Sequence, residues 1–250
     1  MSDVRLIVQA DDFGMCHAVN VGVAEAFRNG ILTQAAMMVP CPWFMEAARL
    51  ARANEIPVGM HATLTCDWDY YRWPPLTTGS SLVDEDGTFH RTVKLAAPLV
   101  DYEEARVELM AQAARMIAAG VAPLYIDEHM GNVCTEACAS LCRELDRPFL
   151  YPHVDPHPEM ASIKILSTIP QSRKLDWLLD HLASLGPGLH LIQTHPGVAS
   201  PELRSMTAPD SPVAPWAEEY RVSDLKALTH EKTLKCVADL GIRLTSMADI

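Results

Sequence analysis

The feature that most constrains the fold is an alternation of short apolar runs with longer segments of helical period. The apolar runs lie at residues 4–10, 32–39, 57–65, 124–129, 148–153, 190–195 and 242–246. Between most of them, apolar residues recur three and four positions apart, as in Val107, Met110 and Ala114. Strands and amphipathic helices that alternate in this way predict a parallel sheet with helical crossovers.

The same alternation continues from one end of the chain to the other. We expect the helices at residues 18–29, 42–54, 102–119, 135–145, 175–185 and 223–240. The composition does not shift along the 250 residues and no linker is visible, so we expect one domain over residues 1–250. An α/β sheet of this kind either stays open or closes into a barrel. The length and the number of strand–helix units favour a (β/α) barrel of the TIM type.

Charge and composition limit the classes of molecule that the protein is expected to bind. The chain is 49% apolar with a net charge of −12 and no run rich in Lys or Arg. This balance argues against nucleic acid and against an anionic membrane as partners. No export signal and no apolar run of membrane-spanning length is visible, and the seven cysteines form no C-x-x-C pair. We therefore expect a cytoplasmic protein.

Four of the predicted strands carry residues that can bind a metal or move a proton where they end. These residues are Asp11, Asp12, His61, Asp127, His129 and His195. Each has an ordinary explanation by itself, such as a solvated turn for the aspartates or a hydrogen-bonded core position for His61. The carboxyl ends of parallel strands meet at one face of the sheet, so we expect all six side chains to converge there.

The expected cluster has the composition of a hydrolytic metal site. One carboxylate and two imidazoles, with coordination positions left open, suit a catalytic divalent ion. Two adjacent carboxylates repel each other, and a cation beside them makes the pair tolerable. The carboxylate that does not bind the ion is better used as a general base on water, and a histidine on the opposite wall could protonate a leaving group. This set of groups suits the hydrolysis of an amide or an ester.

Several longer motifs carry a family resemblance. They are A-D-D-F-G-M-C-H-A-V-N-V-G-V-A-E-A-F-R-N-G-I-L-T-Q-A-A-M-M-V, G-M-H-A-T-L-T, S-L-V-D-E-D-G-T-F, Y-I-D-E-H, T-H-P-G, R-V-S-D-L-K-A-L-T and G-I-R-L-T-S. In sequence and in order they resemble the YdjC-like carbohydrate deacetylases, the family that includes chitooligosaccharide deacetylases. The resemblance extends over nearly the whole chain.

The resemblance implies an irregular (β/α) barrel, related to the polysaccharide deacetylases, that removes acetyl groups from N-acetylated sugars. By this similarity Asp11 is the catalytic base, which takes a proton from the attacking water, and His195 is the second catalytic residue, which protonates the departing amine. The ligands of one divalent ion, with Zn²⁺ and Mg²⁺ as candidates, match Asp12, His61 and His129. The chain departs from the usual D-x-H-x-H pattern of the family at Gly131, where the second histidine is missing.

A long segment rich in aromatic residues follows the third predicted strand, in the sequence C-D-W-D-Y-Y-R-W-P-P. Loops of this length in a compact domain are usually functional or disordered, and the aromatic residues argue against disorder. One interpretation is a platform on which the saccharide stacks, formed by Trp68, Tyr70 and Trp73, with Asp127 as a further substrate contact. The other is an aromatic clasp that pins the loop to the barrel.

Two other functions stay open at the level of sequence. A glycosidase would use Asp11 and Asp12 as two carboxylates that flank one glycosidic bond, and it would need no metal. A non-catalytic sugar-binding barrel with a drifted site is compatible with Gly131. A homodimer is expected only because symmetric dimers are the commonest assembly.

Overall fold

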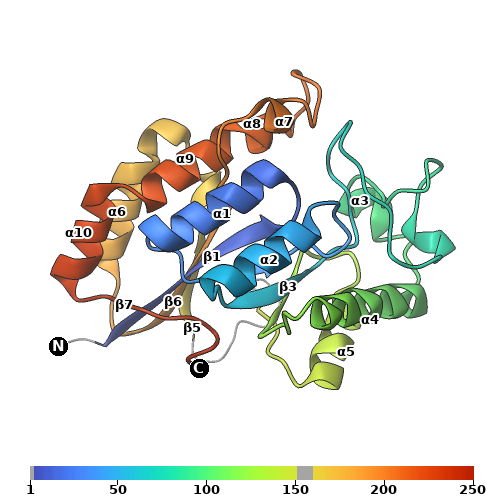
Figure 1. Cartoon of the computed structure of the whole chain (residues 1–250), viewed down its shortest axis with the longest axis horizontal. Helices are drawn as coiled ribbons and strands as arrows, with labels where there is room; N and C mark the ends of the chain where they lie inside the picture. Colours follow the sequence, from blue (N-terminus) through green and yellow to red (C-terminus); the bar gives the residue numbers. More distant parts are fainter. Residues whose placement is uncertain (1–2, 151–159) are drawn as a thin grey trace.

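The strands form one curled, parallel sheet in the computed structural model, which describes residues 3–150 and 160–250 (Figure 1). Of the seven strands in these described ranges, six follow the order β4-β3-β2-β1-β6-β5, and β7 pairs with the first half of β1. Their bounds are β1 Val4–Phe13, β2 Gln34–Met37, β3 Val58–Ala62, β4 Ile126–Glu128, β5 Met160–Ile165, β6 Gly188–Thr194 and β7 Arg243–Leu244.

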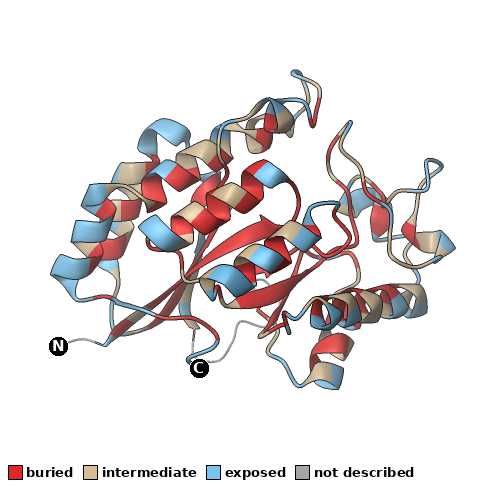
Figure 2. Cartoon of the chain, viewed as in Figure 1, coloured by how far each residue is buried: buried red, intermediate tan, exposed pale blue. Residues whose placement is uncertain are grey.

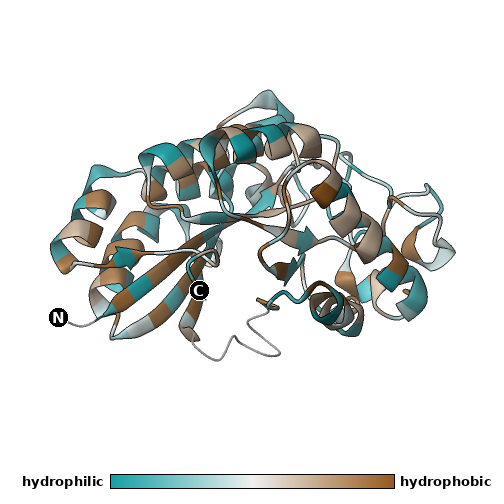
Figure 3. Ribbon diagram, turned by 60° about the horizontal axis from the view of Figure 1, so that its bottom comes forward, coloured by the Kyte–Doolittle hydropathy of each residue, from teal (hydrophilic) through white to brown (hydrophobic). Residues whose placement is uncertain are grey.

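Helices cover the outer side of the curled sheet, as Figure 3 shows in a turned view. Their bounds are α1 His17–Asn29, α2 Phe44–Asn54, α3 Val93–Ala96, α4 Tyr102–Ala118, α5 Thr135–Leu145, α6 Lys174–Ser184, α7 Pro201–Arg204, α8 Ala214–Ala217, α9 Glu219–Leu228 and α10 Glu231–Leu240. Short 3₁₀ helices occur at Ser80–Leu82, Leu166–Thr168 and Gln171–Arg173. Within the two described ranges, no helix is both long enough and apolar enough to cross a membrane.

The sheet is an irregular, incomplete barrel. All of its ladders are parallel, which confirms the expected α/β class. The strands β4 and β5 end the order, and among the described residues no ladder joins them. The barrel expected from sequence is therefore curved but not closed at this seam.

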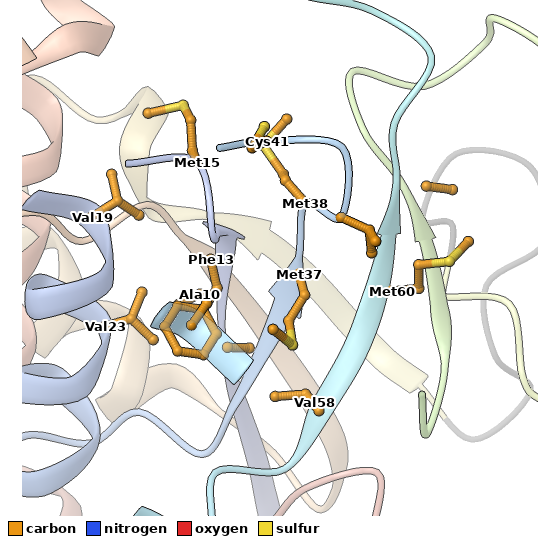
Figure 4. Close-up of a cluster of buried hydrophobic side chains, with 14 of the residues drawn as sticks. Ala10, Phe13, Met15, Val19, Val23, Met37, Met38, Cys41, Val58 and Met60 are labelled. Atoms are coloured by element: carbon orange, nitrogen blue, oxygen red, sulfur yellow. The ribbon is translucent and has the colours of Figure 1, made fainter. Parts of the chain in front are cut away.

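The main core lies between the sheet and its covering helices. Figure 4 shows side chains of β1, β2 and β3 packed against α1, with Ala10, Phe13, Val19, Val23, Met37, Val58 and Met60 among them. Figure 2 shows the same strands buried along their length. Strands that are covered on both faces have near-continuous apolar sequences, which explains why these runs were visible in the sequence. The packed sheet provides a rigid base for the residues at the strand ends.

The helix expected at residues 223–240 is wrong, because this segment contains parts of two helices, α9 and α10. The backbone of His230 is extended, with φ −68° and ψ 136°, and its ring accepts a hydrogen bond from the Lys232 N–H. His230 thus ends the run of helical residues and caps α10. Because the apolar spacing continues across this cap, the pattern alone could not separate the two helices.

Two edge regions of the sheet also differ from expectation. The strand β5 was not predicted, because exposed positions interrupt its apolar residues. The strand expected at residues 148–153 lies partly outside the described residues. In its described part, Phe149 forms an isolated parallel bridge with Ile126. The short helices α3, α7 and α8 were too brief to give a periodic pattern.

Candidate active site

Both aspartates of the D-D pair face the same pocket because β1 bulges where they lie. In a regular strand, adjacent side chains point to opposite faces. Here the register between β1 and β2 shifts between Ala10 and Phe13, and Asp12 has a left-handed φ of 66°. Such a backbone is uncommon for a residue with a side chain and is typical of functional positions. The bulge lets Asp11 and Asp12 line one cavity of about 480 Å³.

The cavity lies at the carboxyl ends of the strands, as the sequence predicted. The expected site residues that line it are Asp11, Asp12, His61, Trp68, Asp127, His129 and His195. Asp67, Trp216 and Arg221 also line it and were not expected. Parallel topology therefore brings together all six of the acidic and imidazole side chains singled out at the strand ends.

Three side-chain atoms form a candidate ligand set for one metal ion. Asp12 Oδ1 lies 3.6 Å from His61 Nε2 and 3.6 Å from His129 Nδ1. The two imidazole nitrogens are 3.1 Å apart. Ligand atoms that share an ion at roughly 2.1 Å are about 3.0 to 3.4 Å apart at octahedral to tetrahedral angles. The triangle is therefore close to the size that a single divalent ion requires.

An unpartnered oxygen supports this assignment. Asp12 Oδ1 is buried and has no hydrogen-bond partner among the described residues, while Oδ2 accepts a hydrogen bond of 2.6 Å from Arg221 Nη2. Burial disfavours the charged carboxylate, but Arg221 and the nearby imidazoles hold the pKa of Asp12 well below its usual range. A buried, ionised oxygen without a partner is costly, and a cation inside the triangle would satisfy it. The residues present thus fit a divalent ion.

Each histidine of the triangle has a carboxylate behind it. His129 Nε2 lies 2.7 Å from Asp67 Oδ2, so the ring donates there and leaves Nδ1 for the ion. His61 Nδ1 lies 3.7 Å from Asp127 Oδ2, with no hydrogen-bond partner in the described part of the chain. Burial lowers the pKa of His61. At His129 burial also acts to lower the pKa, but the charge and hydrogen bond of Asp67, together with the charges of Asp12 and Asp11, outweigh it and raise the pKa. Of these two histidines, His129 is therefore the one at which a proton would compete more strongly with a bound metal ion.

Asp11 and Asp127 are held together by an amide. Gln9 Nε2 donates hydrogen bonds of 2.7 Å to Asp11 Oδ1 and to Asp127 Oδ2. The orientation of this amide is set by Gln34, whose Nε2 donates to Gln9 Oε1 and whose Oε1 accepts from the Met247 N–H, both at 2.8 Å. The backbone N–H can only donate, so the direction of every hydrogen bond in the series follows from it.

This amide also decides between two possible metal positions. Ligand atoms of Asp11, His61 and Asp127 also lie within 4.8 Å of one another. In that second group Gln9 donates to both carboxylates, whereas Asp12 Oδ1 has no hydrogen-bond partner among the described residues. The Asp12 triangle is therefore the stronger candidate for holding an ion. Burial, and then the Asp127 charge, raise the pKa of Asp11 well above its usual value, which gives this carboxylate a high affinity for a proton.

His195 lies across the cavity from Asp11. Its Nε2 is 3.9 Å from Asp11 Oδ2, and its ring meets Trp216 edge-on with centroids 5.6 Å apart. Burial lowers the pKa of His195 to about 4. The imidazole is therefore neutral near pH 7 and must gain a second proton before it can act as a general acid.

The expected aromatic platform is only partly in the cavity. Trp68 lines it, and its indole Nε1 donates to Met15 Sδ at 3.3 Å. Trp73 has no exposed surface, and Tyr70 is 69% exposed and does not line the cavity. Trp216 of α8 supplies a second aromatic wall instead. The clasp interpretation therefore describes Trp73, and the platform interpretation fits Trp68 alone.

Two residues that the sequence interpretation missed differ in the signal they leave. Arg221 pairs with Asp12 across 209 positions, and no local pattern connects the two. Asp67 stands beside Trp68 in an aromatic segment that had already been singled out, so a carboxylate there was the one available signal. Both residues act through contacts that only the packed sheet creates.

Comparisons with known proteins show what the chain is similar to. A family model described as YdjC-like protein matches residues 5–239. A carbohydrate deacetylase from Geobacillus stearothermophilus is 42% identical over 126 residues, which span 49% of this chain and 48% of the relative. A carbohydrate deacetylase from Clostridium beijerinckii is 28% identical over 265 residues, which span 99% of this chain and all of the relative, 100%. An Enterococcus faecalis structure, whose name proposes cellobiose-phosphate cleavage, shares the fold at TM-score 0.81 with 24% identity over 99% of each chain.

Proposed function

The chain belongs to the YdjC-like family, and from this premise we propose a metal-dependent hydrolase that removes the acetyl group from an N-acetylated sugar or short oligosaccharide. The observation that carries the proposal is the buried triangle of Asp12, His61 and His129 with Asp11 beside it and His195 opposite. The names of the relatives, carbohydrate deacetylases, support the same reaction class.

Asp12, His61 and His129 would hold one divalent ion. Two imidazoles and one carboxylate suit Zn²⁺, whereas Mg²⁺ prefers more oxygen ligands. When bound, the ion would polarise the acetamide carbonyl and lower the pKa of a water molecule. Arg221 occupies the second oxygen of Asp12, so this carboxylate would offer the ion one oxygen only.

Asp11 would act as the general base. Gln9 fixes its carboxylate beside the ligand Asp12, and its raised pKa favours the uptake of a proton from the attacking water. A cation beside it would keep the resting carboxylate ionised. Asp11 thus takes one proton as the carbon–oxygen bond forms.

His195 would deliver a proton to the departing nitrogen. The ring is neutral at rest and its Nε2 faces Asp11, so Nε2 can receive from Asp11 the proton that Asp11 took from the water and pass it to the amine as the carbon–nitrogen bond breaks. One proton leaves the water and one is added to the nitrogen, so both side chains end as they began. Trp68 and Trp216 would contact the apolar faces of the sugar.

The two alternative functions are not favoured. A glycosidase would need at least one oxygen of Asp12 to face a sugar, but one is paired with Arg221 and the other faces two imidazoles. A drifted, non-catalytic site would not be expected to keep the ligand triangle, the base and the opposing histidine together. A cytoplasmic location and a homodimer stay predictions of the sequence.

Acetate release from N-acetylglucosamine oligomers, with and without a chelator, tests the proposal. We expect release that stops when the chelator removes the ion and returns when Zn²⁺ is added back. Asp11→Asn should abolish turnover and still bind the metal. Cleavage of the oligomer without acetate release, unaffected by the chelator, would identify a glycosidase, and absence of acetate with every metal and every N-acetyl sugar would refute deacetylation.

A further inference from the structure

A group of buried polar side chains lies behind His195. His195 Nδ1 is 2.8 Å from Ser167 Oγ, and the Ser167 hydroxyl donates to Asp224 Oδ2. The same carboxylate oxygen accepts the backbone N–H of His195 at 2.8 Å. Lys174 forms an ion pair with the other oxygen of Asp224. Ser167, Lys174 and Asp224 are all buried, so these contacts are shielded from bulk water.

Asp224 determines which atom carries each proton. An ionised carboxylate can only accept hydrogen bonds, and the Lys174 ammonium beside it favours the ionised form. The single hydroxyl proton of Ser167 is therefore directed at Asp224. The serine oxygen can then only accept from His195, so the proton of the neutral ring must be on Nδ1. His195 Nε2 is left unprotonated on the side that faces Asp11.

We propose that Ser167, oriented by Asp224, is a positioning residue that fixes His195 as the Nδ1–H tautomer and keeps Nε2 free to receive a proton. The catalytic use of that proton rests on the proposed deacetylase function. The tautomer itself follows from the hydrogen bonds alone.

A second serine–histidine pair, on the strands β5 and β6 that precede Ser167 and His195, predicts the opposite tautomer. Ser162 Oγ lies 2.8 Å from His190 Nδ1, with the same separation of 28 residues as the Ser167–His195 pair. The difference is at the far nitrogen, since His190 Nε2 is 2.8 Å from the carbonyl oxygen of Gly186. A carbonyl can only accept, so His190 carries its proton on Nε2 and accepts from Ser162. The chain thus contains a matched control for the inference.

Nitrogen-15 NMR of the histidine rings, at mildly alkaline pH and with no substrate, tests the tautomers directly. In the unmodified protein, without metal and with Zn²⁺, we expect His195 to be protonated at Nδ1 and His190 at Nε2, with the His195 signals assigned by their loss in His195→Gln. Ser167→Ala should move His195 toward Nε2–H and leave His190 unchanged. Ser162→Ala should leave His195 unchanged.

The kinetic test separates positioning from a general loss of structure. General acid–base groups contribute about 10²- to 10⁴-fold, so Ser167→Ala should lower kcat about 10-fold or more with little change in KM. Ser167→Thr keeps the hydroxyl and should restore both the tautomer and kcat.

An Nε2–H ring at His195 in the unmodified protein would overturn the inference, even if acetate release is observed. An unchanged His195 tautomer in Ser167→Ala would also overturn it. Because the NMR measurement needs no turnover, it decides the inference even if the deacetylase proposal fails.

Discussion

Replacing Asp67 by Asn should weaken metal binding without removing any ligand. The Asp67 carboxylate accepts a hydrogen bond of 2.7 Å from His129 Nε2, and both side chains are largely buried. The carboxylate increases the basicity of His129 Nδ1 and fixes the ring orientation. Losses of such partners typically cost about 10- to 100-fold in metal affinity, which corresponds to about 1.4 to 2.7 kcal/mol.

The size of the loss should depend on what replaces the carboxylate. An Asn side chain can still accept the hydrogen bond, so Asp67→Asn removes the charge and should fall near the lower end of that range. Asp67→Ala removes the charge and the acceptor and should fall near the upper end. Competition with a chromogenic zinc chelator measures both affinities.

A neighbouring aspartate provides the matched control. Asp69 lies in the same loop, accepts hydrogen bonds from Thr207 and from the Ala208 N–H, pairs with Arg91, and does not line the cavity. Asp69→Asn removes an equal charge and should leave zinc affinity nearly unchanged. Equal losses for Asp67→Asn and Asp69→Asn, or no loss for either, would refute the reasoning.

The pH dependence gives a second check on the same residue. Asp67 raises the pKa of His129, so a proton competes with the metal more strongly in the unmodified protein than in Asp67→Asn. The affinity difference between the two proteins should therefore be largest at alkaline pH and narrow as the pH falls. A difference that widens toward acid would contradict this role of Asp67.

Three further outcomes follow from the structure. Arg221→Met removes the guanidinium that pairs with the buried Asp12 carboxylate and should destabilise the metal-free protein by about 3 to 5 kcal/mol. Added zinc should restore part of the lost stability, measured by thermal unfolding. A Cβ on Gly22 would lie 2.5 Å from the Cα of Gly197, so Gly22→Ala should lower the free energy of unfolding in urea by about 1 to 3 kcal/mol. Gly186→Ala places its Cβ in open space and should leave the free energy of unfolding unchanged. The pKa of His195 falls on folding from 6.5 to about 4, so the unfolded chain binds more protons than the folded chain between these pH values. Up to about 3 kcal/mol of the free energy of unfolding, present above pH 6.5, should therefore be lost as the pH falls toward 4. The variant His195→Gln should lack this loss.

Some residues of the site could be predicted from the sequence, because the parallel topology of the sheet determines their positions. Asp11, His61 and His129 lie at or near the carboxyl ends of strands that are apolar and covered on both faces. Such strands are the easiest to recognise, and parallel pairing brings their ends to one face of the sheet. The cluster was therefore visible as a set of strand ends before any distance was known.

The residues that sequence could not predict depend on how the outer elements pack. Arg221 and Asp224 lie on α9, whose end was obscured because the apolar spacing runs on into α10. Ser167 follows β5, an edge strand whose partly exposed residues gave no apolar run. Each of these residues contacts the site across a large separation in sequence, so its role appears only when helix and edge strand are placed on the sheet.

The departure at Gly131 is explained by the backbone after His129. Met130, Gly131 and Asn132 all have left-handed φ angles, with 69° at Gly131, a conformation that glycine adopts at little cost. The Glu128 carboxylate accepts the N–H groups of Val133 and Cys134, which holds the end of this turn without help from residue 131. His129 itself is fixed by Asp67 on its far side. The candidate ligand triangle is therefore supported independently of the missing imidazole, whose absence changes the wall of the cavity and leaves the proposed metal ligands in place.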